Sequence, residues 1–466
     1  MDVAAFDRGL LEATLARALR HGGDFAEVYV EDRDGMNLRL EDGRIEQTSG
    51  GREAGAAVRL LSGERTYYAY SDALDEAGLS AAADAVAAAG RAGAGGAAVV
   101  HLGAVRRLPD AHPVAVPPDG VAIARKAELV RAGDEAARSA GAEVAQVIAG
   151  YGDVRQKVLI ANSLGDLVFD DRTRLRFSVQ VVARRGDVIQ TGHETVGGSA
   201  GFELLDESVA RQTAATAAQK AVTMLDSRPA PVGAMPVVLA NGFGGTLFHE
   251  ACGHGLEADA IAKGASIYAG KMGEVVAAPH VSAYDDGSIP NGWGSQAFDD
   301  EGVPTQKTLV IEEGRLTGYL YDRLRARQMG AEPSGNGRRQ SFRHVPIPRM
   351  TTTYIAPGDA TPDDVIAATP RGFYAKSLAG GQVEPASGAF VFGVAEGYLI
   401  EDGRITTPLR GATLVGNGID ILMKIDMIAG DFEVKSGICG KDGQGVPVGT
   451  GQSTLRIAEM TVGGTG

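Results

Sequence analysis

The chain has 466 residues, a formal net charge of −14 and 44% apolar residues. A chain of this length is too long to fold around one ordinary hydrophobic core, so we predict two domains. The negative charge argues against a nucleic-acid partner, because phosphate is repelled by an acidic surface. No stretch approaches the length of a membrane span, and the first 20 residues carry early acids instead of a basic segment followed by an apolar one. With only two cysteines, we expect a cytoplasmic protein without membrane contact.

The first half of the chain is predicted to combine helices with antiparallel strands. Helical spacing or alanine-rich composition predicts helices over residues 7–20, 72–90, 119–140 and 206–225. Alternating polar and apolar residues predict strands over 26–32, 36–40, from 44 onwards, and over 155–161, 166–171 and 174–184. Turns are expected at Asp34-Gly35, Asp42-Gly43, Asn162-Ser163 and Arg185-Gly186. Residues 92–100 have the composition of a weak linker.

A domain boundary is predicted within residues 228–236. This segment contains three prolines, which break helices and are excluded from central strands. We therefore predict an N-terminal domain over residues 1–230 and a C-terminal domain over residues 231–466. The second is expected to open with a strand over 236–241, a glycine-rich turn and a helix. Short strands and turns should follow, and the glycine-rich segment 433–457 is expected to form a catalytic loop region.

These elements predict an α+β fold class. The N-terminal domain should hold an antiparallel sheet plus helices, and the C-terminal domain should be β-rich with one metal-binding helix. The strands do not alternate regularly with helices, which argues against a doubly wound parallel sheet.

The helix predicted after residue 241 carries the pattern His249-Glu250-x-x-x-His254. It resembles the zinc motif H-E-x-x-H but has one more residue between the histidines. On an ideal helix, residues five apart point about 140° from each other, whereas residues four apart differ by about 40°. Both rings could therefore face one metal only if the backbone is distorted. Gly253 and Gly255 make distortion inexpensive, so we predict a π-type turn or helix break near residues 252–255.

A catalytic zinc site normally needs a third protein ligand beside an open position. Four residues could supply it by their chemistry: Glu257, His280, His344 and Cys439. Cys439 lies in a glycine-dense segment and offers a soft thiolate. The residue types alone leave these alternatives open.

Six segments together resemble the TldD branch of the TldD/PmbA (TldE) peptidase family. They are FHEACGHGLEAD (248–259), SGICGKDGQGVPVGTGQSTLRI (436–457), TVGGTG (461–466), PRMTTTYIAPGDA (348–360), MIAGDFEVKSG (427–437) and FDDEGVPTQKTLVIEEGRLTGYL (298–320). The resemblance covers the whole chain and is strongest after residue 230. It implies a zinc-dependent peptidase acting on unfolded or small peptides, with Zn²⁺ on His249, His254 and Cys439. It does not assign Cys252, where the family more often has an aliphatic residue.

The resemblance also implies a dimer that encloses a cavity. The partner would be a second copy or a TldE-like subunit, which typically lacks the H-E-x-x-x-H motif. Because this chain has the motif, it resembles the catalytic partner. The natural substrate and the choice between endopeptidase and exopeptidase action are left open, as are the roles of Cys252, His280 and His344.

The expected mechanism is hydrolysis by a zinc-activated water, with Glu250 as the general base. Two other functions remain. A non-proteolytic regulatory subunit would hold a structural zinc and need a fourth ligand, such as Glu257 or Cys252. A zinc amidase would act on a small amide in a narrow pocket. A peptide could add as a strand to an open sheet edge, which would give recognition through its main chain.

Two groups of charged residues are predicted to lie at the surface. The acidic pairs and triplets at 285–286 and 299–301 are interpreted as surface turns. Arg338, Arg339, Arg343 and Arg349 are interpreted as a solvated loop or a subunit interface, with binding of a peptide's terminal carboxylate as a lesser alternative.

Overall fold

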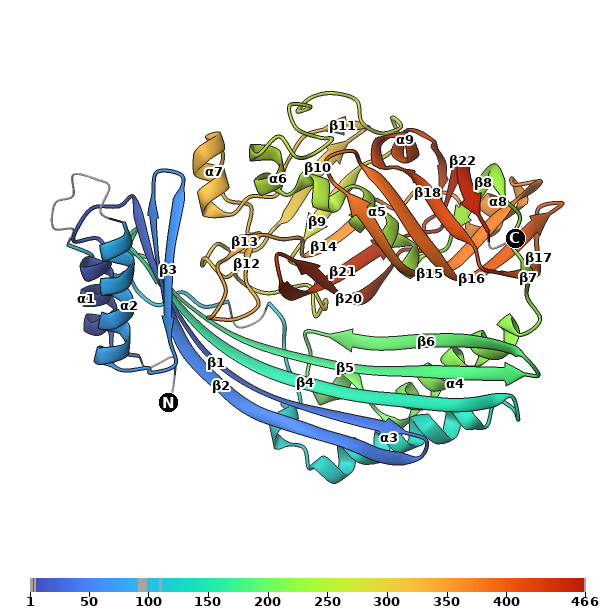
Figure 1. Ribbon diagram of the computed structural model, residues 1–466, viewed down its shortest axis with the longest axis horizontal. Helices are drawn as coiled ribbons and strands as arrows, with labels where there is room; N and C mark the ends of the chain where they lie inside the picture. Colours follow the sequence, from blue (N-terminus) through green and yellow to red (C-terminus); the bar gives the residue numbers. More distant parts are fainter. Residues whose placement is uncertain (1–2, 4–5, 91–98, 109–110, 465–466) are drawn as a thin grey trace.

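The computed structural model describes residues 3, 6–90, 99–108 and 111–464. Most of the weak linker predicted at 92–100 lies outside these residues. None of the helices described is long and apolar enough to cross a membrane. The α+β class is confirmed, with an extended antiparallel sheet in the first half and a β-rich second half (Figure 1).

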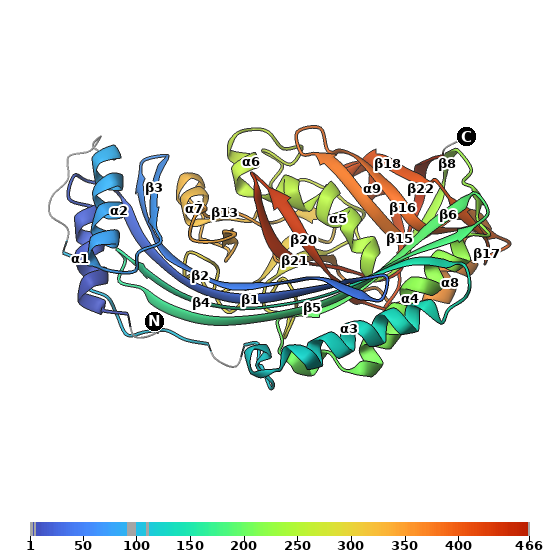
Figure 2. The same ribbon diagram turned by 60° about the horizontal axis from the view of Figure 1, so that its bottom comes forward.

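The first half is built on a long six-stranded sheet in the order β3-β2-β1-β4-β5-β6, with every neighbouring pair antiparallel. Its strands are β1 (Phe25–Glu41), β2 (Arg44–Ser62), β3 (Arg65–Ser71), β4 (Val144–Asn162), β5 (Leu167–Arg185) and β6 (Val188–Gly198). The sheet curves along its length and its concave face is turned towards the second half (Figure 2).

Four helices cover the other face of this sheet. They are α1 (Arg8–Ala18), α2 (Glu76–Ala89), α3 (Ile123–Arg138) and α4 (Glu207–Met224), with short 3-10 turns at Pro118–Gly120 and Phe202–Leu204. Successive side chains of β1 point to opposite faces of the sheet, so this strand contacts the helices on one face and the second half of the chain on the other. Its even-numbered residues, such as Val28 and Leu38, join helix-packed cores, whereas Tyr29 packs with Phe298 and Phe342 of the second half.

Two interruptions predicted between strands of this sheet were wrong. The predicted turn at Asp34-Gly35 does not exist, because β1 continues through Gly35, which pairs with Gly51 on one side and Val154 on the other. Likewise, residues 166–171 and 174–184 belong to one strand, β5. The turn at Asp42-Gly43 is confirmed: both residues have positive φ, as a tight hairpin requires.

The second half contains two larger sheets. One has the order β11-β10-β9-β14-β21-β20, and the other has the order β15-β8-β22-β18-β16-β17-β7 with β19 paired to β22. Parallel pairs occur only at β14–β21, β15–β8 and β17–β7 among the named strands. The largest buried core of the described chain lies between these sheets and the short helices around them.

The strands of the second half are β7 (Arg228–Pro229), β8 (Gly233–Leu239), β9 (Ala283–Asp286), β10 (Lys307–Glu312), β11 (Arg315–Leu316), β12 (Gly337–Arg338), β13 (Ile347–Pro348), β14 (Thr352–Ile355), β15 (Arg371–Glu384), β16 (Ala389–Glu401), β17 (Arg404–Arg410), β18 (Thr413–Asn417), β19 (Ile425–Ile428), β20 (Glu433–Lys441), β21 (Gln444–Gln452) and β22 (Leu455–Gly463). Its helices are α5 (Gly245–Ala251), α6 (Ala258–Ala262), α7 (Arg323–Met329), α8 (Pro362–Ala367) and α9 (Gly418–Met423), with 3-10 turns at Gly242–Gly244 and Gly253–Leu256.

The glycine-rich segment predicted as a catalytic loop is a β-hairpin. Strands β20 and β21 pair along their whole length without a register shift. Glu433 lies opposite Gln452 at one end, and Lys441 lies opposite Gln444 at the other. The turn is Asp442-Gly443, where both residues have positive φ. Several of the glycines fill close contacts within the sheet: a Cβ at Gly449 would lie 2.6 Å from Thr352 Oγ1. Glycine here permits packing and does not mark an irregular loop.

The charged groups interpreted as surface turns are mostly buried between the two halves. Arg59 of β2 pairs with Glu301, Arg172 of β5 with Asp300, and Arg339 with Glu27. Asp285, Arg338 and Arg349 are also buried, and only Arg343 is exposed as predicted. The interpretation failed because a sequence does not show which distant charges will neutralise each other. The domain boundary near residue 230 stays a prediction.

Candidate metal centre

His249, His254 and Cys439 meet at one point in the second half. One potential ligand atom from each lies within 4.8 Å of the others. Cys439 Sγ is 3.3 Å from His254 Nε2, although the two residues are 185 positions apart. His249 and Cys439 are buried and the His254 side chain is 11% exposed. The fold thus brings together two histidines from one short segment and a cysteine from a distant strand.

A break in the helix allows both histidines to face the same point. Helix α5 ends at Ala251, Cys252 has φ −126° and ψ −48°, and a 3-10 turn over Gly253–Leu256 carries His254. The predicted helix break is confirmed, although it is a 3-10 turn and not a π-bulge. His254 therefore lies beyond the helix that carries His249. The two rings are 5.3 Å apart between centroids and almost perpendicular.

The two glycines of this segment are needed for packing as well as for the turn. A Cβ on Gly253 would overlap Met350 Sδ, and one on Gly255 would lie 2.8 Å from the Tyr268 ring. Both distances are below normal van der Waals contact. Residues 253–255 can therefore fit into the surrounding core only without side chains at these two positions.

Each histidine is oriented by a polar neighbour on its Nδ1 atom. His254 Nδ1 lies 2.9 Å from Glu257 Oε2, and His249 Nδ1 lies 3.2 Å from Thr353 Oγ1 of β14. These contacts leave the Nε2 atoms free to point towards the centre. Partners of this kind commonly fix the tautomer and ring orientation of metal-binding histidines. Thr353 was not singled out from the sequence, and Glu257 was considered only as a ligand.

Two basic residues attach the Cys439 strand to the histidine segment. Arg349, which is fully buried, donates to the Cys439 carbonyl oxygen at 2.5 Å. Lys441, on the same strand as Cys439, contacts Glu257 at 2.9 Å and Asp259 at 2.6 Å. One sequence signal could have indicated Lys441: it lies two residues after Cys439, so both side chains project to the same face of β20.

The charges of the centre favour a thiolate. Burial alone would raise the pKa of Cys439, but hydrogen bonds from His249 and His254 outweigh it and lower this pKa to about 5. Burial would also raise the pKa of Glu257, yet His254 and Lys441 hold it at about 2. A deprotonated thiol is the form that binds metal, and protons on the imidazoles would be released when a metal binds.

Glu250 lies at the accessible side of the centre. Its Oε2 atom is 3.7 Å from His254 Nε2, and its side chain is 26% exposed. The two metal-facing histidines are less exposed, so Glu250 is the acidic side chain of the motif that solvent can reach. This position allows it to exchange a proton with a molecule bound at the centre.

The remaining sequence candidates do not join this group. Among the residues that the structure describes, the cluster capable of holding a metal contains neither Cys252 nor His280 nor His344. Cys252 is completely buried, which raises its pKa to about 12. His280 is exposed, and His344 contacts Ser341 Oγ at 2.9 Å.

The donor set fits a zinc ion. Two imidazole nitrogens and a thiolate are common zinc ligands, and tetrahedral zinc places such atoms about 3.3–3.8 Å apart. The 3.3 Å between Cys439 Sγ and His254 Nε2 falls in this range, and no separation within the group exceeds 4.8 Å. Three protein ligands leave one position for a reactant.

Comparison with known proteins agrees with this arrangement. Family profiles match residues 26–89 as PmbA/TldA metallopeptidase domain 1, residues 116–225 as the central domain and residues 232–464 as the C-terminal domain. A metalloprotease TldD homolog of Haemophilus influenzae is 41% identical over 451 residues, covering 95% of this chain and 93% of that protein. A zinc metalloprotease TldD homolog of Saccharolobus solfataricus is 33% identical and covers 64% of this chain and 66% of that protein.

The fold is also found among solved structures. The crystal structure of TldE from Thermococcus kodakarensis superimposes with a TM-score of 0.77 at 20% identity, covering 98% of this chain and all of that one. At this sequence identity, the match supports a shared fold and nothing more. The profile matches and the identity to the Haemophilus relative show that the chain belongs to the PmbA/TldD metallopeptidase family.

Proposed function

We propose that this protein is a zinc-dependent peptidase that hydrolyses unfolded or small peptides, with zinc held by His249, His254 and Cys439. The observation that supports this most is the meeting of the three side chains beside Glu250. A relative named as a zinc metalloprotease supports the choice of metal. When bound, zinc would act as a Lewis acid towards a carbonyl oxygen and make a water molecule more acidic.

The residues of the chain have separate roles in this proposal. Glu250 accepts a proton from the attacking water and passes it to the leaving amine as general base and then general acid. Glu257 and Thr353 keep the two imidazoles in one tautomer and orientation. Arg349 and Lys441 hold β20 against the histidine segment, so that the thiol stays within reach of the rings.

Strand β20 offers a place for an extended peptide. It is the last strand of its six-stranded sheet, so only one of its edges is paired with another strand that the structure describes. A peptide that adds to such an edge is held by main-chain hydrogen bonds and has little dependence on its side chains. Because Cys439 lies on β20, this mode would bring a peptide bond close to the centre.

The protein is further proposed to work as a dimer, either with a second copy or with a TldE-like subunit. Its similarity in fold to a TldE protein supports the second possibility. A regulatory subunit with a structural zinc is the competing function. It would need a fourth protein ligand, and the described cluster contains three.

The test combines metal analysis with hydrolysis. The purified chain, alone and mixed with a TldE-like subunit, is assayed with an unstructured fluorogenic peptide before and after chelation. We expect about one zinc per chain and cleavage that stops on chelation and returns with zinc. Bound zinc with no cleavage in either preparation would contradict the peptidase and favour the regulatory subunit.

A further inference from the structure

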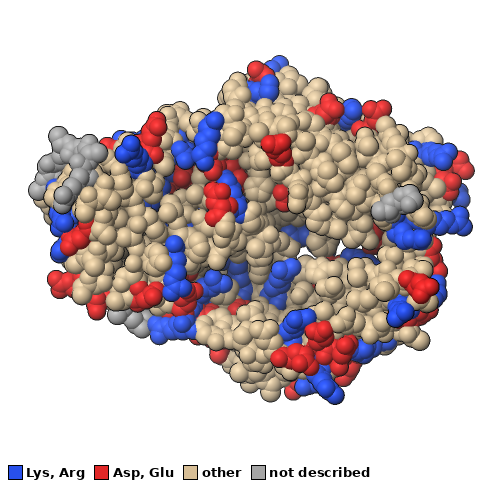
Figure 3. Space-filling view, viewed as in Figure 1, with Lys and Arg blue, Asp and Glu red and all other residues tan. Residues whose placement is uncertain are grey.

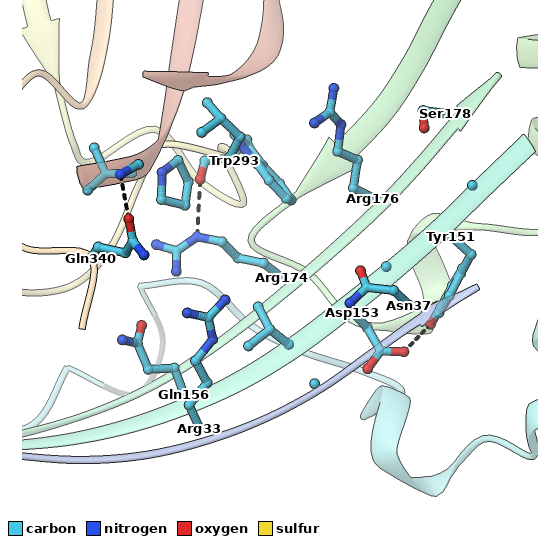
Figure 4. Close-up of a pocket in the computed structure, with 18 of the residues that line it drawn as sticks. Arg33, Asn37, Tyr151, Asp153, Gln156, Arg174, Arg176, Ser178, Trp293 and Gln340 are labelled. Carbon is cyan, nitrogen blue, oxygen red and sulfur yellow. Dashed lines mark hydrogen bonds between the residues drawn. The ribbon is translucent and has the colours of Figure 1, made fainter. Parts of the chain in front are cut away.

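A cavity of about 820 Å³ lies between the concave face of the long sheet and the β20–β21 hairpin. Strands β1, β4 and β5 form its floor, and Trp293, Ile438 and Pro447 belong to the opposite wall. The molecule is hollowed between its two halves (Figure 3), and Trp293 lies beside Arg174 and Arg176 in the close-up (Figure 4). Ile438 immediately precedes Cys439, and successive side chains on a strand point to opposite faces. The cavity and the candidate metal centre therefore lie on opposite faces of the same edge strand.

The carboxylates of this cavity are already neutralised. Glu53 pairs with Arg343, Asp153 with Lys126, and Asp300 with Arg172. The cavity also contains three arginines that pair with carboxylates, namely Arg39, Arg172 and Arg339. In contrast, four others form no ion pair with any carboxylate in the described part of the chain: Arg33, Arg174, Arg176 and Arg338. The cavity thus has an excess of positive charge inside a protein whose net charge is −14.

Arg174 and Arg338 are almost fully buried, and neither forms an ion pair with a carboxylate in the described part of the chain. Arg174 donates to the carbonyl oxygens of Trp293 and Ser295, at 3.2 and 3.3 Å, and lies near the side-chain oxygen of Gln296. Arg338 donates to the carbonyl oxygens of Met350 and Pro447. Burial and neighbouring arginines lower the pKa of Arg174 to about 9 and that of Arg338 to about 10. The hydrogen bonds of both guanidinium groups go to neutral oxygens, and Asp300 attracts both groups from beyond ion-pair distance. A buried cation in such surroundings is stabilised further when an anion approaches it.

The floor of the cavity leaves space above the sheet. One cross-strand row contains Gly51, Gly35 and Val154 beside Arg174. The next two rows on the same face of the sheet contain Gly152 beside Arg176 and Gly150 beside Ser178. A Cβ on Gly51 would meet no atom within 4 Å. Figure 4 shows Arg33, Arg174 and Arg176 projecting from different parts of this floor into the same space. Glycines in strand interiors often mark the close approach of a ligand.

We propose that this cavity binds a carboxylate group of the peptide substrate, through Arg33 and Arg174. Arginine suits this ligand because its planar guanidinium can donate two parallel hydrogen bonds to one carboxylate. The source would be an acidic side chain or the C-terminal carboxylate of a peptide bound along β20. The identity of the ligand as a peptide rests on the proposed function, whereas the preference for a carboxylate rests on the cavity itself.

Trp293 allows the binding to be measured without any hydrolysis. It is the only tryptophan of the chain, and it lies in the cavity wall with its indole nitrogen donating to the Gly437 carbonyl oxygen at 2.8 Å. Four versions of one short peptide are titrated while its fluorescence is followed: with Glu or Gln at an internal position, and with a free or amidated C-terminus. We expect the version that supplies the recognised carboxylate to bind at least about tenfold more tightly than its neutral counterpart.

Two arginine variants and a matched control assign the effect to the cavity. Arg33→Gln and Arg174→Gln should lose the tenfold preference. Arg184→Gln should keep it, because this variant removes the same charge from an exposed position of β5 outside the cavity. Arg33 is partly exposed, so Arg33→Gln tests the inference even if Arg174→Gln does not fold.

Several outcomes would overturn the inference. Equal binding of all four peptides would do so, as would an Arg33→Gln variant that behaves like Arg184→Gln. A change in oligomeric state of Arg33→Gln, measured by light scattering, would instead make the cavity wall a subunit contact. Carboxylate-selective binding without hydrolysis would support the carboxylate site and contradict the proposed peptidase function. Hydrolysis without carboxylate selectivity would support the peptidase function and contradict the carboxylate site.

Discussion

The Glu257 carboxylate lies 2.9 Å from Nδ1 of His254, three residues earlier in the chain. The same oxygen accepts from Lys441 at 2.9 Å, so one carboxylate joins the histidine segment to the strand that carries Cys439. Glu257 is completely buried, and its second oxygen has no hydrogen-bond partner. Its position explains how an irregular turn can hold an imidazole in a fixed orientation.

Glu257→Gln is therefore expected to weaken zinc binding without removing a ligand. Loss of a partner that orients a metal-binding histidine commonly reduces affinity by about 10–100-fold. The measurement is competition for zinc with a coloured chelator of known affinity. Glu274→Gln, on an exposed side chain that pairs with Lys271, is the control and should bind as the parent does. Unchanged affinity of Glu257→Gln would show that the contact does not orient His254.

The two cysteines should differ in their effect on metal content. Cys439→Ser is expected to lose most bound zinc, because it replaces a thiolate ligand at the centre with a much weaker hydroxyl donor. Cys252→Ser should keep zinc and lower the free energy of unfolding by about 1–3 kcal/mol, since it places a more polar hydroxyl at a fully buried position whose polar neighbour is Tyr268. Elemental analysis and denaturant unfolding of the two variants separate these effects. Full zinc content in Cys439→Ser would contradict its assignment as a ligand.

Glu250→Gln should keep zinc and lose turnover. Glutamine has nearly the same size but cannot accept the proton, and removal of a general base typically lowers the rate by about 10²–10⁴-fold. Peptide hydrolysis is compared with zinc content in the same preparation. A variant that cleaves at the parent rate would show that Glu250 is not the base.

The sequence predicted the elements of this fold better than the environment of its charges. The Asp42-Gly43 turn and the helix break near Cys252 followed from local conformational rules, and both occur. The Asp34-Gly35 turn does not, because pairing on both edges of β1 outweighs the local preference of glycine. Neither the burial of Arg59 and Glu301 nor the orienting role of Thr353 could be predicted, since each depends on contacts between distant segments.

Gly253→Ala should destabilise the histidine segment through one identifiable contact. The added Cβ would overlap Met350 Sδ in the core, and overpacking of this kind costs about 1–3 kcal/mol. When Met350→Ala is already present, Gly253→Ala should lower the free energy of unfolding by less than it does in the parent, because the smaller side chain makes room for the methyl group. A double-mutant cycle of unfolding free energies measures the recovery. Additive losses would show that the turn, and not Met350, requires glycine.

The pH dependence of stability should contain a contribution from Asp322 at the start of α7. Burial and the nearby Glu301 carboxylate raise the pKa of Asp322 to about 7, so the folded protein holds this proton more tightly than the unfolded chain. For an acid with a raised folded pKa, the stabilising contribution is complete below about pH 4 and is lost as the pH rises through about 7.

Asp322→Asn keeps a side-chain oxygen that can accept from the Arg325 amide, as Asp322 does, but cannot ionise. Unfolding free energies at pH 5 and pH 8.5 should therefore differ less in this variant than in the parent, by roughly 2–4 kcal/mol. Asp363→Asn, at an exposed position in the first turn of α8, should leave the parent's pH dependence unchanged. The same pH dependence in parent and Asp322→Asn would show that Asp322 remains ionised throughout this range.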